Sequence, residues 1–330
     1  MMPIFQLFLY CKRAMFAKIR QISAISKKFT EYMSSRLCFL LILSLIGTSE
    51  ALSSNFLIEY EFSESLIKQV DAEEIVWLET GIKRKTFALF TDAENIDIQG
   101  GAIILSDFNQ HPDWPQITRQ LRKALPRFGW QTLSIQMPII ENHPTNIELE
   151  RQYNAVGSRI QAGIDHFKEK GVQNIVLIGR SQTANIAIRY TAEISQQIQD
   201  EENPEESAIQ ALVCISAFDS PWLNVSESIR QIPIAILDIF GENDIPEVLM
   251  SAKKRLIASQ FSAKLKHRPT TLPSSRKVQK LAINKTGNLR YRQAVIAGAD
   301  HQFTRQDREL VKYIRGWLGI YAAGEEVESQ

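Results

Sequence analysis

The sequence predicts an α/β fold in which a mostly parallel central sheet is covered by helices on both faces. From about residue 100 onwards, short segments that are apolar throughout alternate with longer segments of helical periodicity. Strands that are apolar on both sides are typical of a parallel sheet buried between two helical layers. A second observation is the sharp turn at residues 179–182, which joins an apolar strand directly to a helix.

The expected elements begin with two short β-like segments, residues 74–78 and 85–90, which flank a turn at Gly81 and predict an antiparallel pair. Six further strands are expected, because each is a short run dominated by apolar residues. They cover residues 101–105, 130–135, 174–178, 211–215, 234–240 and 291–296.

Four helices are expected between or after these strands, because their apolar residues recur at helical spacing. They cover residues 114–128, 147–170, 182–197 and 307–321. Gly129 and Gly171 follow the first two, as glycine commonly does at the C-terminus of a helix. The segments 216–233 and 256–288 are the candidates for a small cap above the sheet.

The composition excludes several classes of protein. Of the 330 residues, 23% are charged and 44% are hydrophobic, which excludes disordered and fibrous proteins. The 38 basic residues nearly balance the 37 acidic ones, whereas a nucleic-acid-binding protein normally has a basic excess. We therefore expect no nucleic-acid partner.

Cysteine usage and motif content predict neither a disulfide nor a cofactor. Of the three cysteines, only Cys214 lies beyond residue 51, so the body of the chain has no internal disulfide and no cysteine-based metal site. The sequence contains no glycine-rich dinucleotide motif, no phosphate-binding loop and no clustered metal-ligand pattern. We expect no cofactor and no metal.

Residues 1–51 are predicted to be an N-terminal extension that ends in a secretory signal peptide. An apolar run at residues 37–47 is followed by Ser49-Glu50-Ala51, which fits a small-x-small cleavage site. A start at Met33 gives a signal of ordinary length, and the run is short for a membrane span. We expect an exported, periplasmic or cell-envelope protein without a stable membrane span. The alternative is a protein anchored in the membrane by an uncleaved signal.

The junction after the third parallel strand has the pattern of a nucleophile elbow. Gly179-Arg180-Ser181-Gln182-Thr183 follows an apolar strand and leads at once into a helix, which is the context of a catalytic serine. The serine hydroxyl then projects above the sheet, and the backbone N–H of Gln182 can stabilise an oxyanion. Thr183 stands where glycine is usual, which favours an altered elbow. The alternative is an ordinary strand-to-helix turn with Ser181 as the helix cap.

An acid and a histidine follow this serine in the chain order that such hydrolases require. Asp244 comes after the strand at residues 234–240, and His301 comes after the last strand. His301 is placed to take the proton of Ser181, and Asp244 to orient the imidazole ring. Asp219 is an alternative acid. Asp300 is interpreted as a loop residue beside the histidine.

The loop after the first parallel strand is expected to complete an oxyanion hole. In this architecture the loop supplies the second backbone N–H, here from Phe108 or Asn109. Asp107 stands at the start of this loop, which is often rich in glycine. His111 and Trp114 are interpreted as residues that cap and pack the following helix.

Several segments resemble a bacterial family of unknown function within the α/β-hydrolase superfamily. They are residues 110–115, 129–138, 241–246, 291–293 and 298–303. The resemblance covers most of residues 74–320. It implies the α/β-hydrolase fold and export from the cytoplasm, and it implies no particular substrate.

These observations predict a single α/β-hydrolase domain over residues 52–330, with a short acidic tail. The favoured function is that of a secreted serine hydrolase that cleaves a small ester, thioester or amide with Ser181, Asp244 and His301. The alternative is a non-catalytic protein of the same fold that binds a cell-envelope ligand or partner, because a fold alone does not determine function.

Overall fold

The computed structural model describes residues 56–81, 85–140, 145–200, 208–220, 222–260 and 291–322. The chain divides into two compact units, residues 1–57 and 58–330, and the fold below is that of the second. The predicted signal peptide and its cleavage site lie outside the described residues. No helix in the described part of the chain is long and apolar enough to cross a membrane.

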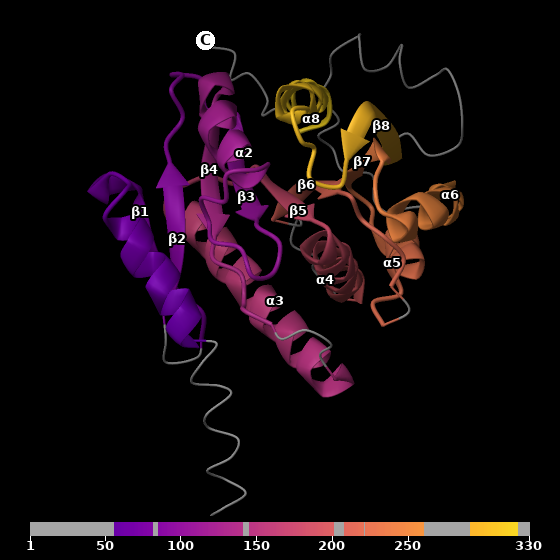
Figure 1. The fold of residues 1–330 in the computed structure, drawn as a ribbon, viewed down its shortest axis with the longest axis horizontal. Coiled ribbons are helices and arrows are strands. Elements are labelled where there is room, and N and C mark those ends of the chain that lie inside the picture. Colours follow the sequence, from indigo (N-terminus) through magenta and orange to yellow (C-terminus); the bar gives the residue numbers. More distant parts are fainter. Residues whose placement is uncertain are drawn as a thin grey trace, which may run out of the picture. The chain divides into compact units, whose positions relative to one another are not determined.

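The described strands form one eight-stranded sheet in the order β1-β2-β4-β3-β5-β6-β7-β8 (Figure 1). The strands are β1 (Ile75–Glu79), β2 (Lys85–Thr91), β3 (Gly100–Leu105), β4 (Trp130–Ile135), β5 (Ile175–Arg180), β6 (Ile209–Ile215), β7 (Ala235–Asn243) and β8 (Tyr291–Asp300). Strand β2 pairs antiparallel with both β1 and β4, and all other neighbours pair parallel. This arrangement confirms the predicted α/β-hydrolase fold.

Helices cover both faces of the sheet (Figure 1). They include a helix over residues 56–67, α2 (Thr118–Ala124), α3 (Asn146–Glu169), α4 (Gln182–Asp200), α5 (Val225–Gln231), α6 (Pro246–Gln260) and α8 (Asp307–Tyr321), with short 3₁₀ turns η1 (Ala72–Glu74) and η2 (Leu125–Phe128). Because side chains alternate along a strand, Ile103 packs with the α3–α4 layer, while its neighbour Ile104 packs with α2 and α8. Both faces of the sheet are therefore apolar.

Local signals in the sequence explain where several helices begin and end. Thr145 and Glu148 form a capping box at the start of α3, which satisfies backbone N–H groups that have no partner within the helix. The predicted helix at residues 114–128 is shorter at both ends. It begins at Thr118, and its end is replaced by a 3₁₀ turn that contains Pro126, which has no N–H to donate. Gly129 closes that turn with φ +82°, a conformation that glycine adopts readily.

The structure describes only part of the two predicted cap segments. Residues 216–233 contain α5, a helix of only 7 residues. The segment 256–288 begins within α6, which ends at Gln260, and the remainder lies outside the described residues.

Candidate active site

Ser181, Asp244 and His301 each follow directly after the last residue of a parallel strand. Strand β5 ends at Arg180, β7 at Asn243 and β8 at Asp300. Strands β7 and β8 remain paired as far as Asn243 and Asp300, so both loops leave the sheet at the same level. The carboxyl ends of parallel strands are the usual place for a binding site in an α/β sheet.

Ser181 adopts the backbone conformation of a tight strand-to-helix turn. Its φ is +52°, which costs a residue with a side chain about 1–2 kcal/mol. The turn is held because the Ser181 N–H donates to the carbonyl of Ile215, 2.8 Å away. A Cβ at Gly179 would lie 2.7 Å from the Cα of Ala184, so only glycine lets strand and helix approach this closely. Ser181 is 6% exposed.

Thr183 fits the elbow although glycine is usual at its position. The side chain is fully buried, and its hydroxyl donates to the carbonyl of Arg180 at 2.8 Å and accepts the N–H of the same residue at 3.1 Å. The Leu105 carbonyl lies 3.4 Å from the hydroxyl. Because its polar atom has partners, the threonine is accommodated without the cost of an unsatisfied buried hydroxyl.

His301 and Asp244 form a close pair. Nδ1 of His301 lies 2.6 Å from Oδ1 of Asp244. The carboxylate also accepts the Ser216 hydroxyl at 2.5 Å and the backbone N–H groups of Gly241 at 3.1 Å and Ile245 at 2.8 Å. Burial alone would raise the pKa of Asp244, but these hydrogen bonds outweigh it and hold the pKa below its ordinary value. Asp244 therefore stays ionised and can orient the imidazole.

The alternative acid, Asp219, is not hydrogen-bonded to His301 in this structure. Its carboxylate pairs with Lys254 on α6 and accepts the N–H of Ser226 at 3.3 Å.

Asp300 accepts the backbone N–H groups of Gln302 at 3.0 Å and Thr304 at 2.9 Å. It therefore shapes the loop that carries the histidine, as the sequence indicates.

Both backbone N–H groups expected from the loop after β3 already have partners. The Phe108 N–H donates to Oδ1 of Asp107 at 2.9 Å. The Asn109 N–H donates to the carbonyl of Pro138 at 3.5 Å, and Asn109 itself has φ +63°. Gln182 is the first residue of α4, where backbone N–H groups have no partner within the helix. Of the three expected donors, the two on the loop after β3 are therefore engaged within the protein.

Asp107 is a site residue whose role the sequence did not reveal. Burial raises the pKa of its carboxyl, while the nearby Arg180 charge, the hydrogen bond from the Phe108 N–H and the nearby Ser181 hydroxyl oppose that rise without cancelling it. His301 also acts on it electrostatically. The carboxyl group of Asp107 thus lies close enough to the Ser181 hydroxyl and to the Arg180 charge to act on both.

His111 has a structural environment. Its Nδ1 accepts the backbone N–H of Asp113 at 3.2 Å. Its ring packs edge-on between Phe62 and Trp114, with centroid distances of 5.5 and 5.2 Å. These contacts show that His111 and Trp114 pack before the following helix, whereas no side chain of the described residues caps α2, which begins at Thr118.

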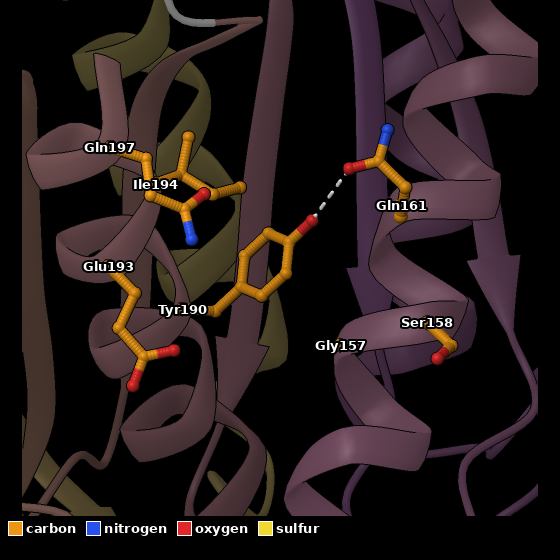
Figure 2. Close-up of a pocket in the computed structure, with 7 residues that line it drawn as sticks. All are labelled: Gly157, Ser158, Gln161, Tyr190, Glu193, Ile194 and Gln197. Carbon is orange, nitrogen blue, oxygen red and sulfur yellow. Dashed lines mark hydrogen bonds between the residues drawn. The ribbon is translucent and has the colours of Figure 1, made fainter. Parts of the chain in front are cut away.

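A groove of about 310 Å³ lies elsewhere, between α3 and α4. Figure 2 shows Tyr190 reaching across it to Gln161, and the two side chains are joined by a hydrogen bond of 3.0 Å. None of the residues that line it is Ser181, Asp244 or His301, so it is separate from the candidate active site.

Among the described residues, no group of three or more His, Cys, Asp or Glu side chains gathers to hold a metal.

Comparison with known proteins places the chain in a family and supports the fold. A family profile described as "Protein of unknown function (DUF3530)" matches residues 59–151 and 141–282. None of the curated proteins matches the sequence.

Several solved structures share the fold. The dienelactone hydrolase of Anabaena variabilis is 16% identical, with a TM-score of 0.52 over 75% of this chain and 97% of its own. The esterase Pf2001 of Pyrococcus furiosus is 13% identical, with a TM-score of 0.52 over 76% and 92%. Est1E of Butyrivibrio proteoclasticus, solved with ferulic acid, is 13% identical, with a TM-score of 0.51 over 74% and 98%. Such low identities establish the fold alone. The match to the family profile shows that the chain belongs to the DUF3530 family, and the solved structures show that it has the fold of the α/β hydrolases.

Proposed function

We propose that the protein is a serine hydrolase that cleaves a small ester, thioester or amide by acyl transfer. The observation that carries this proposal is the 2.6 Å pair of His301 Nδ1 and Asp244 Oδ1, which lies at the same sheet edge as Ser181. Ser181 has the positive φ of a nucleophile elbow. In a serine hydrolase, a base that is oriented by an acid activates a serine held on a tight turn at the same edge of the sheet.

In the proposed reaction, Ser181 gives its proton to Nε2 of His301 while its oxygen attacks the carbonyl carbon. Asp244 holds the Nδ1–H and stabilises the imidazolium that forms. His301 then protonates the leaving oxygen, sulfur or nitrogen, whose bond to the carbonyl carbon breaks, and Ser181 remains as an acyl ester. A water molecule deprotonated by His301 attacks this ester and releases the acid and free Ser181.

Oxyanion stabilisation in this reaction needs the carboxyl of Asp107 to be neutral or displaced. An ionised carboxylate that accepts the Phe108 N–H removes a donor and adds negative charge where an oxyanion forms. Its raised pKa favours the neutral form. With that group neutral or displaced, the N–H groups of Gln182 and Phe108 are the proposed donors.

The second candidate is a hydrolase-fold protein that binds a cell-envelope ligand without turnover. The observation that favours it is again Asp107, which occupies the Phe108 N–H and interacts with the Ser181 hydroxyl. The ligand would then lie at the carboxyl ends of β5, β7 and β8 without forming a covalent bond to Ser181.

A fluorophosphonate probe separates these candidates, because it forms a covalent adduct only with an activated serine. The wild type is expected to be labelled at Ser181, and Ser181→Ala is expected not to be labelled. Ser195→Ala is a matched control, since Ser195 is a buried serine of helix α4, which follows Ser181, and its hydroxyl donates to a backbone carbonyl. Equal labelling of wild type and Ser181→Ala would favour the binding protein.

We also propose that residues 1–51 direct export and are then removed. The apolar run at residues 37–47 and the small residues Ser49 and Ala51 support this proposal. The hydrolase domain would then act in the periplasm or cell envelope.

A further inference from the structure

Arg180 occupies a buried position between the three loops of the candidate active site. It is the last residue of β5 and immediately precedes Ser181. Only 2% of its surface is exposed, so the side chain is not available to bind a substrate directly. A fully buried guanidinium must find hydrogen-bond acceptors within the protein to offset its lost hydration.

Two of the three guanidinium nitrogens find acceptors on loops far away in the sequence, while the buried Nε has none among the described residues. Nη2 donates to the backbone carbonyl of His301 at 3.1 Å and to Oε1 of Gln302 at 2.7 Å. Nη1 donates to Oε1 of Gln110 at 3.5 Å. One side chain thus connects the elbow after β5, the histidine loop after β8 and the loop after β3.

The other buried arginines of the described chain are bonded differently. Arg122, Arg159 and Arg255 each pair with a carboxylate, on Asp113, Glu59 and Asp238 respectively. Within the described residues, no carboxylate lies at ion-pair distance from Arg180. Burial lowers its pKa, and the more distant Asp107, Asp244 and Asp300 only partly oppose this. An arginine bonded to neutral acceptors contributes little net stability, because its desolvation is poorly compensated.

We propose that Arg180 is a positioning residue that holds the His301 backbone and the loop after β3 against the Ser181 elbow. This inference rests on the proposed serine hydrolase. A lysine cannot replace Arg180, because a single ammonium group lacks the planar fork that reaches separate acceptors on two loops. Without the guanidinium, the His301 loop can shift. A displacement of the His301 ring by about 1 Å is expected to lower the reaction rate about 100-fold.

The test compares Arg180→Lys with Arg255→Lys. Arg255 is a matched control, because it is also fully buried but pairs with Asp238 beneath β7 and β8. For each variant, the measurements are the melting temperature and the maximal rate and affinity of fluorophosphonate labelling at Ser181. Arg180→Lys is expected to slow the maximal labelling rate about 100-fold with little change in probe affinity. Arg255→Lys is expected to lower the melting temperature but to leave the rate of the folded protein unchanged.

A second readout does not depend on catalysis. The hydrogen-bonded Nδ1–H of His301 gives a low-field proton NMR signal, which is assigned by its loss in His301→Gln. This signal is expected to shift or broaden in Arg180→Lys and to persist in Arg255→Lys. If the wild type is not labelled, the proposed hydrolase function fails, and this signal still tests the positioning role.

If Arg180→Lys does not fold, Gln302→Ala tests the neighbouring bond from Nη2 to the histidine loop. It removes one neutral acceptor of the guanidinium and leaves the charge in place. The variant is expected to be labelled about 10-fold more slowly, because it loses one hydrogen bond to a charged group. The inference is overturned if whichever of these variants folds is labelled at the wild-type rate and shows an unchanged His301 signal. The proposed function would remain intact.

Discussion

The carboxyl of Asp107 accepts the backbone N–H of Phe108, with 2.9 Å between Oδ1 and the nitrogen. Burial raises the pKa of this carboxyl, and the opposing influence of the Arg180 charge, the Phe108 N–H and the nearby Ser181 hydroxyl does not cancel the rise. The protein therefore keeps an unfavourable acid beside the serine at the end of β5. Groups that lower stability in this way are typical of functional sites.

Asp107→Asn is expected to stabilise the protein at neutral pH. The folded-state pKa of Asp107 lies above its unfolded value, so folding stability falls as pH rises from the unfolded pKa through the folded one. Asparagine does not ionise, so the variant avoids this loss, which is about 1.4 kcal/mol for a carboxyl whose pKa rises by one on folding. Chemical denaturation should show the variant to be more stable at pH 7, with the difference shrinking towards pH 4. A variant that is less stable at pH 7 would contradict this.

The same substitution is expected to affect the rate of ester hydrolysis. An ionised Asp107 opposes the negative charge of the tetrahedral intermediate, whereas asparagine does not. The ratio of kcat in Asp107→Asn to kcat in the wild type should therefore exceed one and rise with pH. A ratio below one at all pH values would mean that the carboxyl assists the reaction.

Asp244→Asn is expected to have the opposite effect on stability. The folded-state pKa of Asp244 lies below its unfolded value, so its contribution is present above the unfolded pKa and is lost as pH falls through the folded pKa. The variant should be about 1–3 kcal/mol less stable at pH 7, because the hydrogen bonds to a charged acceptor are lost. Denaturation curves of the two proteins should converge in strong acid. Parallel curves at all pH values would show that the carboxylate charge is unimportant.

The sheet and the three strand-end residues could be predicted from the sequence, because apolar strands and turns are local features. The ends of β7 and β8 were harder to predict from the sequence. The predicted strands stop at residues 240 and 296, whereas the structure extends them to Asn243 and Asp300. These extra residues include glycines and acids of low strand propensity, and pairing between the two strands decides their conformation.

The environment of Arg180 could not be predicted from local pattern. The guanidinium bonds to residues 70, 121 and 122 positions away in the sequence. The only signal was an arginine at the end of an apolar strand, which implies a buried charge in need of partners. The role of Asp107 was hidden for a similar reason, because it depends on the distant Ser181 and Arg180.

Gly179→Ala is expected to destabilise the elbow. Its new Cβ would lie 2.7 Å from the Cα of Ala184, so strand and helix must separate at a cost of about 2–3 kcal/mol. Gly316→Ala is the matched control, because a Cβ there meets nothing within 4 Å and alanine favours a helix by about 0.5–1 kcal/mol. Urea denaturation should therefore show opposite shifts, and a neutral Gly179→Ala would mean that the elbow is loosely packed.

Export can be tested by expression from Met33 in a bacterial host. N-terminal sequencing of the mature protein is expected to begin near Leu52, after the small residues of the predicted cleavage site. Ala51→Arg is the control, because a large charged residue at the cleavage position blocks processing. Recovery of wild-type protein from the membrane with residues 37–47 intact would favour an uncleaved anchor.

The decisive measurement for the proposed chemistry is the hydrolysis of a short activated ester. Ser181→Ala and His301→Ala should each abolish most of kcat/KM, and the double variant should lose little more, because nucleophile and base act as one unit. Asp244→Asn should lose less than Ser181→Ala, since the acid orients the imidazole without accepting its proton. Asp219→Asn serves as the control acid, because Asp219 pairs with Lys254 rather than with the histidine. Its rate should stay at the wild-type level. If wild type and Ser181→Ala hydrolyse the ester equally, the acyl-transfer mechanism fails, and ligand binding at the strand ends becomes the better account of the site.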